Sequence, residues 1–586
     1  MPIDYHERTE EEYRRRASVM IQNFEGYRAA PYDAEDGKAT IGFGYTFNRN
    51  NNLELWDRAG VQLSQTERQQ LIAIDRAPEG QKTALGLGFD VRITREEARS
   101  LLENASLPTY ERPATNLEMP FSDERAVVVS LTYNRGQGRM ETHMQGFNDA
   151  ITDGDRAEAW YQLRYNSRGT NADPDVQLGL RARRNMEAEI FGLYNDPSNV
   201  SSEEARSVYR MFQLHRDDIL ENERNWGVDL DGNPARSNAI AQANNNYPDL
   251  VQEYGQVQTL AAVLEPARDR LLEDLRVENP DLADRLQSED FATTAIHFDP
   301  GRELRTGHRL RQDQRNNTFQ DVDENHAVTL DSRRMQGNIE IASNDLLIGD
   351  GGNDTLRSHR GDDVLIGGQG RDRMEGGEGR DTYVIEAGDT VMDSDGLGEV
   401  RWSGQALTGG ARAASDPVDT YRSEDGRFIY ALDNNTLSVT DTLASDPALR
   451  DPVVIENFRN GQLGITLGGP PTDPHRPDDQ RHGRVVEEGH GPGSAVPSGP
   501  ASAPDAEDRR SARDPERGPF NDPFVNNAYA ALLAGDSKEL DHIALEFSRS
   551  PEGQRMAEVG DQLLAQHQRV DEQQRSQAHQ APAMHM

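Results

Sequence analysis

The sequence contains no cysteine and very little lysine, and each absence narrows what the chain can do. Without cysteine, its 586 residues form no disulfide, no thiolate metal site and no thiol nucleophile. Lysine occurs only at Lys38, Lys82 and Lys538, and a formal charge of −39 argues against nucleic acid as a partner. No apolar run reaches the roughly 18 residues that indicate a membrane-spanning helix.

Hydrophobic residues are also scarce, at 34% of the chain. This composition and length predict about three or four domains together with segments that pack no core. The first residues, Met-Pro-Ile-Asp-Tyr-His-Glu-Arg, contain no apolar stretch of the kind found in secretory signal peptides. If the protein leaves its cell, we therefore expect a signal-peptide-independent route.

Residues 24–47 carry the most informative pattern for function. A helix leads into them, and its apolar residues recur on one face: Tyr13, Ala17, Met20, Ile21 and Phe24. Thr9 and Glu12 have the spacing of a capping box at its start, and Gly26 marks its end. Glu25 is therefore expected on the last helical turn, facing whatever lies beyond the helix.

A short acidic turn and a predicted strand follow. Ile41, Phe43, Tyr45 and Phe47 alternate with Thr40, Gly42, Gly44 and Thr46. This period of two predicts a strand with a buried aromatic face and a bare glycine face, against which a flat ligand could lie. A carboxyl at a helix end, acids in a turn and a threonine-lined strand are the groups that glycoside cleavage uses.

These motifs resemble the phage-type lysozymes of glycoside hydrolase family 24. In that family a Glu, an Asp and a Thr line the cleft, and the Glu is the general acid. The resemblance implies Glu25, Asp33 and Thr40 as catalytic residues. The family position of the aspartate falls on Ala34, so Asp36 remains a competitor of Asp33.

Weaker motifs continue the resemblance and predict an α+β lysozyme-like domain over residues 1–196. Residues 93–98 open a helix, residues 122–134 form an apolar helix, and residues 179–184 precede a closing helix, in the family's order. In the family, an arginine of the last motif pairs with the catalytic glutamate. Arg181 is the expected partner here, with Arg184 next.

A second strong pattern is an internal repeat of nine residues. Its aspartates are Asp345, Asp354, Asp363, Asp372 and Asp381; glycines at 352, 361, 370 and 379 stand two residues before the last four, and an apolar residue stands two residues after each aspartate. Each nonapeptide combines a glycine turn with a short strand, so two of them form one turn of a parallel β-roll.

Stacked aspartates repel one another unless a hard cation with oxygen ligands lies between them, which indicates Ca²⁺. The repeat resembles the RTX calcium-binding repeats of secreted bacterial proteins. We expect the five aspartates, with Gly352, Gly370 and Gly379, to form the calcium sites. The alternative, a flexible linker rich in Gly and Asp, does not account for five frames in register.

The remaining segments complete a multidomain architecture. We expect a helical spacer over residues 197–335, the β-roll with a strand-rich cap over 336–467, a disordered linker over 468–521 and a small α-helical module over 522–586. The Leu-Asp-His-Ile and Ser-Pro-Glu-Gly-Gln motifs of this module resemble the C-terminal recognition domain of interbacterial type IV secretion effectors of xanthomonads.

Together these patterns predict a secreted antibacterial lysozyme (an N-acetylmuramidase) that acts in the periplasm of target bacteria and folds its roll on Ca²⁺. Its expected partners are peptidoglycan, the coupling protein of a secretion machinery and a cognate periplasmic immunity inhibitor. Two alternatives stay open: an RTX lysozyme exported by a type I system, and a non-catalytic, calcium-dependent cell-wall-binding protein. The RTX array disfavours a third, a virion-associated phage lysin.

Overall fold

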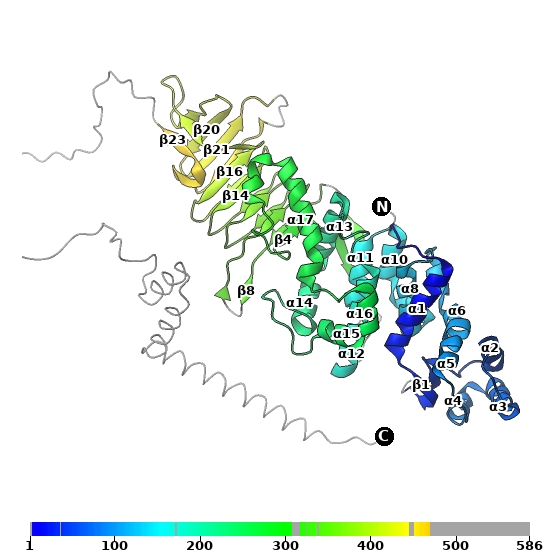
Figure 1. Cartoon of the computed structure of the whole chain (residues 1–586). Coiled ribbons are helices and arrows are strands. Elements are labelled where there is room, and N and C mark those ends of the chain that lie inside the picture. The colour runs from blue at the N-terminus through cyan, green and yellow to red at the C-terminus, as the bar shows by residue number, and fades with distance from the viewer. Residues whose placement is uncertain are drawn as a thin grey trace, which may run out of the picture. The chain divides into compact units, whose positions relative to one another are not determined.

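The computed structural model describes residues 3–34, 37–169, 173–306, 317–323, 325–336, 339–444 and 450–468 (Figure 1). The predicted C-terminal module, the linker from residue 469 onward and Asp36 lie outside these residues. Helices form the first half of the described chain, and strands dominate from residue 296 onward. Within the described part, the structure contains no helix that is both long and apolar enough to cross a membrane.

The first helix, α1 (Glu10–Glu25), has the boundaries that the sequence indicates. Thr9 accepts a hydrogen bond from the backbone N–H of Glu12, and the side chain of Glu12 accepts one from the backbone N–H of Thr9. The helix ends at Gly26, whose φ of +64° favours glycine. Glu25 is the last helical residue, which confirms its predicted place.

A small antiparallel sheet follows, in the order β1 (Arg28–Asp33), β2 (Ala39–Gly42) and β3 (Tyr45–Thr46). The prediction of one continuous strand over residues 40–47 is wrong, because Phe43 and Gly44 form the turn of a hairpin. Gly44 has a φ of +92° there. The aromatic side chains are nevertheless buried, as the alternation predicts.

The glycine face of this hairpin is covered by protein. A Cβ atom at Gly42 would lie 3.2 Å from the Cβ of Ala98, and one at Gly44 would lie 3.0 Å from the ring of Tyr133. The expectation of a bare face open to a ligand is therefore wrong. The glycines allow close packing against neighbouring helices instead.

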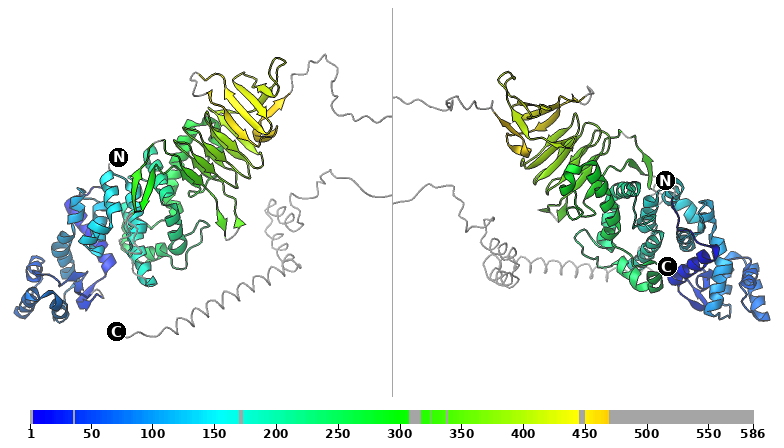
Figure 2. Two further views of the ribbon diagram at one scale, coloured as in Figure 1. Left: turned by 180° about the vertical axis from the view of Figure 1, so that it is seen from behind. Right: turned by 45° about the horizontal axis from the view of Figure 1, so that its top comes forward.

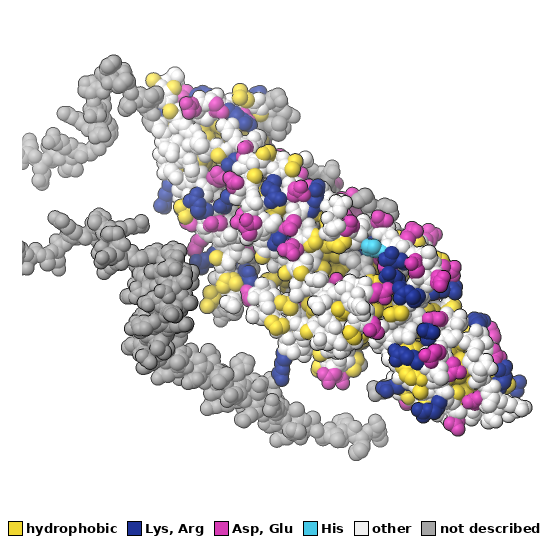
Figure 3. All heavy atoms as spheres, in the orientation of Figure 1, with side chains coloured by type: hydrophobic (Ala, Val, Ile, Leu, Met, Phe, Trp, Pro, Cys, Tyr) yellow, Lys and Arg dark blue, Asp and Glu magenta, His cyan; other side chains and the backbone are white. Residues whose placement is uncertain are grey.

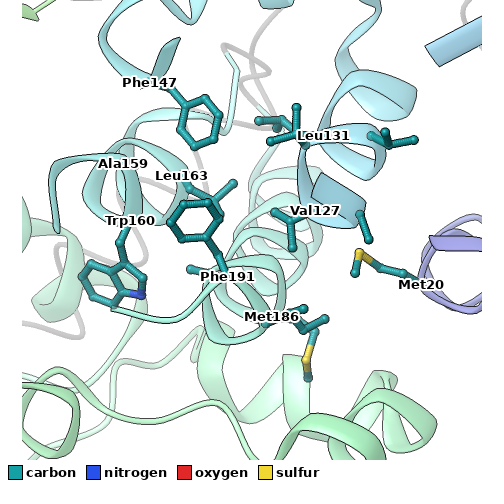
Figure 4. Packing of buried hydrophobic residues seen from close by; sticks show 14 of the residues in the cluster. Met20, Val127, Leu131, Phe147, Ala159, Trp160, Leu163, Met186 and Phe191 are labelled. Carbon is teal, nitrogen blue, oxygen red and sulfur yellow. The ribbon is translucent and has the colours of Figure 1, made fainter. Parts of the chain in front are cut away.

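The lysozyme-like region is completed by short helices around one core. They are α2 (Asn52–Arg58), α3 (Gln65–Arg76), α4 (Glu79–Leu87), α5 (Arg95–Leu101), α6 (Leu107–Tyr110), α7 (Arg112–Asn116), α8 (Asp123–Arg135), α9 (Gln137–His143), α10 (Gln145–Asp153), α11 (Arg156–Tyr161) and α12 (Pro174–Phe191). Met20 of α1, Leu131 of α8 and Phe191 of α12 belong to this core (Figure 4).

The predicted helix starts at residues 94 and 122 are confirmed by capping side chains. Thr94 caps α5, and Ser122 accepts a hydrogen bond from the N–H of Arg125 to cap α8. The prediction that residues 179–184 precede the closing helix is wrong. Asp173 caps α12 and Pro174 occupies its first turn, so the motif lies inside the helix.

The expected spacer is helical as far as residue 285. Its elements are α13 (Ser202–Leu214), α14 (Arg216–Trp226), α15 (Ala239–Asn246), α16 (Pro248–Tyr254), α17 (Leu260–Glu278) and a 3₁₀ segment (Pro280–Arg285). These helices share a hydrophobic core with the lysozyme-like region, and α15 packs along α12. They therefore form one packed body with that region, which a mere spacer would not.

Strands replace helices after this point. β5 (Arg302–Thr306) and β6 (Asn317–Asp321) form one hairpin, and β8 (Met335–Gln336) and β9 (Ile339–Glu340) form another. β4 (Ile296–Phe298) and β7 (Thr329–Asp331) each pair in parallel with a roll strand. Two strands of the expected spacer thus already belong to the roll.

The roll has two parallel sheets whose strands alternate along the sequence (Figure 2). One contains β10 (Leu346–Ile348), β12 (Val364–Ile366), β14 (Asp381–Ile385) and β16 (Gly398–Trp402); the other contains β11 (Thr355–Arg357), β13 (Arg373–Glu375) and β15 (Thr390–Met392). Leu346 pairs with Val364, and Thr355 pairs with Arg373. Each turn therefore spans two nonapeptides, as predicted, around buried residues such as Leu365.

A mainly antiparallel cap follows the roll and confirms the expected β character there. It comprises β17 (Gln405–Ala406), β18 (Gly409–Ala411), β19 (Thr420–Arg422), β20 (Phe428–Asp433), β21 (Thr436–Asp441), β22 (Val453–Glu456) and β23 (Thr466–Gly468). β22 pairs in parallel with β15 and in antiparallel fashion with β21, so the cap continues one sheet of the roll. This covers a sheet edge that would otherwise expose unpaired backbone groups.

Candidate functional site

Glu25 forms an ion pair that crosses the lysozyme-like region. Its Oε1 accepts a hydrogen bond of 2.7 Å from Nη1 of Arg183 on α12. The side chain of Glu25 is 23% exposed, whereas that of Arg183 is 6% exposed. A partly open carboxyl held by a buried arginine can meet a substrate while keeping a fixed orientation.

The prediction that Arg181 pairs with Glu25 is wrong, and Arg184 does not make this pair either. Arg181 donates a hydrogen bond of 2.6 Å to Oδ1 of Asn222, and its guanidinium lies 4.5 Å from the ring centroid of Trp226. Because the motif lies inside α12, its arginines point in different directions around the helix.

A fully buried carboxylate, Glu187, holds the arginine in place. Nε of Arg183 donates to Oε1 of Glu187 at 3.1 Å, and the hydroxyl of Ser130 donates to the same oxygen at 2.6 Å. Arg184 pairs with the other oxygen of Glu187. Burial opposes ionisation of Glu187, but Arg184 and Arg183 outweigh it and keep its pKa below the ordinary value.

The other two expected catalytic residues lie on the small sheet. The register pairs Thr40 with Tyr32 and Asp33 with Ala39. Opposite residues of an antiparallel pair point to the same face, so Thr40 and Asp33 leave the sheet on different faces. Thr40 is buried, whereas Asp33 is exposed at the end of β1.

Tyr133 lies near Glu25, and the sequence patterns did not indicate a role for it. Its hydroxyl donates a hydrogen bond of 2.8 Å to the backbone carbonyl of Phe43. Burial raises the pKa of Tyr133 well above its ordinary value, and the charge of Glu25 adds to this rise. Tyr133 therefore joins α8 to the hairpin within electrostatic reach of Glu25; its signal in the sequence is the Tyr-Asn-Arg that ends the apolar helix.

The roll brings the repeat aspartates into two rows. Oδ1 of Asp363 accepts a hydrogen bond of 2.7 Å from the backbone N–H of Asp345, one turn earlier. Asp372 and Asp381 make the same bond to the N–H of Asp354 and Asp363, at 2.8 and 3.1 Å. The second oxygen behaves differently: Oδ2 of Asp354, Asp363, Asp372 and Asp381 is buried without a hydrogen-bond partner.

Burial makes these carboxylates hard to ionise. It raises the pKa of Asp354 and of Asp381 to about 7 and that of Asp363 to about 8, and nearby aspartates add to each rise. A buried charge without a partner is costly, so these oxygens fit the ligand set of a hard cation. Among the described residues, His, Cys, Asp and Glu side chains form no cluster of three or more suited to a metal.

Glycines preserve the space beside these oxygens. A Cβ atom at Gly367 would lie 2.5 Å from Oδ2 of Asp372, and one at Gly376 would lie 2.3 Å from Oδ2 of Asp381. The expected site glycines stack between turns: a Cβ at Gly370 would lie 1.5 Å from the carbonyl oxygen of Gly352, and Gly379 is similarly close to the preceding turn. Backbone carbonyl oxygens of one turn thus lie close to the glycines of the next turn. An all-oxygen site for Ca²⁺ uses such carbonyl groups.

The sequence pattern missed one aspartate of the ladder. Oδ1 of Asp389 accepts a hydrogen bond of 2.8 Å from the N–H of Asp372, but the two residues are 17 apart instead of 18. Its Oδ2 accepts a bond of 2.7 Å from the N–H of Glu386. Both oxygens are therefore satisfied, and Asp389 ends its row without an orphaned oxygen.

Comparisons with known proteins match two regions of this chain. Residues 22–187 match the phage lysozyme family, and residues 348–383 match four copies of the RTX calcium-binding nonapeptide repeat. The chain therefore carries a phage lysozyme domain, a glycoside hydrolase of the lysozyme kind with peptidoglycan as its implied substrate, and RTX repeats that bind calcium. Such repeats indicate a secreted protein. Neither match reaches the C-terminal module.

No curated protein matches this chain. Among solved structures, it is similar to the AlgE6R3 subunit of the Azotobacter vinelandii mannuronan C5-epimerase, with 21% identity over 30% of this chain and 94% of that one. The TM-score of 0.17 is too low for this likeness to support a conclusion about fold or function.

Proposed function

We propose that the protein is a secreted antibacterial lysozyme that cleaves the glycan strands of peptidoglycan in the periplasm of target bacteria. The observation that carries this proposal is the placement of Glu25, at the end of α1 and paired with the buried Arg183, inside a phage lysozyme domain. The RTX repeats support export, because millimolar calcium outside a cell favours folding of the roll and low cytosolic calcium does not.

In this proposal Glu25 is the general acid that protonates the leaving glycosidic oxygen. Because Arg183 donates to Oε1, the transferable proton belongs on Oε2. Thr40 and a carboxylate of the acidic turn position a water on the opposite face of the sugar, so the product is inverted. Buried Arg183 keeps the acid aligned with the bond that it protonates.

The test is Glu25→Gln in the full-length protein. Gln keeps the shape and accepts the bond from Arg183 but has no proton to transfer, so we expect at least about a 100-fold loss of activity on purified peptidoglycan. The circular dichroism spectrum should stay unchanged. Glu10→Gln, on the first turn of the same helix, is the matched control and should remain fully active. An active Glu25→Gln variant would refute the role of Glu25.

Two aspartates are candidates for the water-side carboxylate. We assign it to Asp33, with Asp36 as the alternative. The β1–β2 register counts against Asp33, because it leaves the sheet on the face opposite Thr40. Asp33→Asn and Asp36→Asn, assayed side by side, decide: the larger loss identifies the residue, and two active variants would leave Thr40 alone to hold the water.

For export, we propose that residues 522–586 are recognised by the coupling protein of a type IV secretion machinery and that a periplasmic immunity inhibitor protects the producer. Deletion of this module should leave hydrolysis of isolated peptidoglycan unchanged and abolish killing of neighbouring bacteria. Continued killing by the truncated protein would favour export by a type I system. A wild-type protein that binds peptidoglycan without cleaving it would support the non-catalytic alternative.

A further inference from the structure

Helices outside the matched lysozyme segment touch the residues around Glu25. Phe24, the neighbour of Glu25 on α1, meets the ring of Tyr247 edge-on, with centroids 4.8 Å apart and an interplanar angle of 89°. Tyr247 stands immediately before α16 and is buried. Phe24 also contacts Arg183, whose guanidinium lies 4.6 Å from the Phe24 ring centroid. Tyr247, Phe24 and Arg183 therefore form one cluster beside the ion pair.

A second contact fixes the helix that carries Arg183. Two residues earlier on α12, Arg181 stacks on Trp226 and donates to Asn222, both on α14. α15 packs along the same helix. Residues of α14 to α16 thus contact α12, while Glu187 and Ser130 hold Arg183 from within the lysozyme domain.

These contacts matter because of where Glu25 lies. It occupies the last turn of α1, where backbone carbonyls lack intrahelical partners, and Gly26 follows with a positive φ. A helix end of this kind needs side-chain contacts to keep a fixed direction. Catalysis depends on such alignment, since a displacement of about 1 Å costs about 100-fold in rate.

We propose that Tyr247 and Trp226 are positioning residues of the lysozyme site. Tyr247 fixes Phe24, Trp226 fixes α12, and both act through the Arg183–Glu25 ion pair. The proposal rests on the proposed role of Glu25 as general acid. It assigns α14 to α16 a role in aligning the catalytic site. These helices lie beyond the family match, which ends at residue 187.

The test compares full-length variants on soluble peptidoglycan fragments at saturating calcium. We expect Tyr247→Ala to lower kcat by at least about tenfold with KM within about twofold, because the acid is misaligned while the substrate still binds. Tyr247→Phe keeps the ring edge and should stay within about threefold of the wild type in kcat. Trp226→Leu should lower kcat in the same direction, and Trp226→Phe should restore it.

The matched control is Tyr254→Ala. Tyr254 ends α16, and the guanidinium of Arg16 on α1 lies 5.3 Å from its ring centroid. Tyr254 is not part of the cluster of Tyr247, Phe24 and Arg183. Its loss should lower the melting temperature without a comparable change in kcat. If Tyr247→Ala does not fold, Tyr247→Leu, which keeps the apolar bulk, takes its place.

A loss of kcat in the Tyr247 and Trp226 variants no larger than in Tyr254→Ala would overturn the inference. So would a loss that Tyr247→Phe fails to rescue. Glu25→Gln, measured in the same assay, distinguishes a failure of the proposed function from a failure of this inference. If it is active, the proposed function fails; if it is inactive and the Tyr247 variants match the control, only this inference fails.

Discussion

The lysozyme region and the roll both bury carboxylates, but they compensate the charge in opposite ways. In the lysozyme region, Glu187 lies between two arginines, and Glu124 pairs with Arg156 at 2.9 Å. In the roll, four buried aspartates each keep an oxygen without a partner. One region supplies its own cations, and the other leaves that role to calcium.

The difference bears on the proposed export of the chain. A region with internal ion pairs folds wherever the chain is, whereas a region with uncompensated carboxylates folds only where a cation binds. On the face that Figure 3 shows, acidic and basic side chains are interspersed. We therefore expect folding of the roll to depend on the calcium concentration around the protein.

The largest predicted effect concerns the internally compensated region. Glu187→Gln removes the carboxylate between Arg183 and Arg184 and leaves two buried guanidinium groups without a full counter-charge. We expect it to lower the free energy of unfolding by about 3–5 kcal/mol, measured by urea denaturation in calcium. Asp57→Asn, which breaks the exposed pair with Arg68 at 2.6 Å, should cost far less, because exposed ion pairs add little to stability. Equal costs would contradict internal compensation.

A smaller effect separates two aspartates of the same row. Asp372→Asn removes the charge of a carboxylate whose own Oδ2 has no partner, so we expect the calcium concentration at the folding midpoint to rise roughly tenfold. In Asp389→Asn, an amide group would face the N–H of Glu386, which destabilises the roll by about 1–3 kcal/mol but leaves calcium affinity nearly unchanged. Calcium titrations followed by circular dichroism measure both; identical shifts would show that Asp389 is also a ligand.

The smallest predicted effect is a pH dependence in the lysozyme region. Nδ1 of His6 lies 2.6 Å from Oε1 of Glu124, and this hydrogen bond raises the pKa of His6. A raised folded-state pKa stabilises the protein fully below about pH 6.5, and the contribution disappears as the pH rises through the folded value.

His6→Gln should therefore flatten the change in unfolding free energy between about pH 6 and pH 8. The difference should stay below about 1 kcal/mol, because His6 is partly exposed and Arg156 still pairs with Glu124. Urea denaturation at both pH values in calcium is the measurement. Identical pH profiles for the wild type and His6→Gln would show that His6 does not contribute to the pH dependence of stability.

Local patterns predicted the elements well, and tertiary contacts decided what those patterns could not. The capping box at Thr9 located α1, and the nonapeptide period predicted the two-repeat turn of the roll. The hairpin at Gly44 was missed because alternation continues across its turn. Which of Arg181, Arg183 and Arg184 pairs with Glu25 depends on the rotation of α12 about its axis. That rotation cannot be read from one sequence. Asp389 escaped because its spacing shifts by one residue.

The Arg183 network had a signal that could have been used. Arg183 and Glu187 have the i, i+4 spacing of a helical ion pair. The contacts of Tyr247 and Trp226 had none, since they join segments far apart in the sequence. Motifs thus supply candidate catalytic residues, whereas the side chains that contact those candidates become visible only in the fold.

Hydrogen–deuterium exchange on the full-length protein, in calcium, in chelator and in magnesium, tests the central claim most directly. The account predicts that calcium alone strongly protects the backbone amides of residues 345–392, because their buried carboxylates lack internal cations. α1, α8 and α12 should exchange equally slowly in all three conditions, because their carboxylates are paired within the protein. Equal protection of the roll in calcium and chelator, or loss of protection in α12 on chelation, would contradict the account.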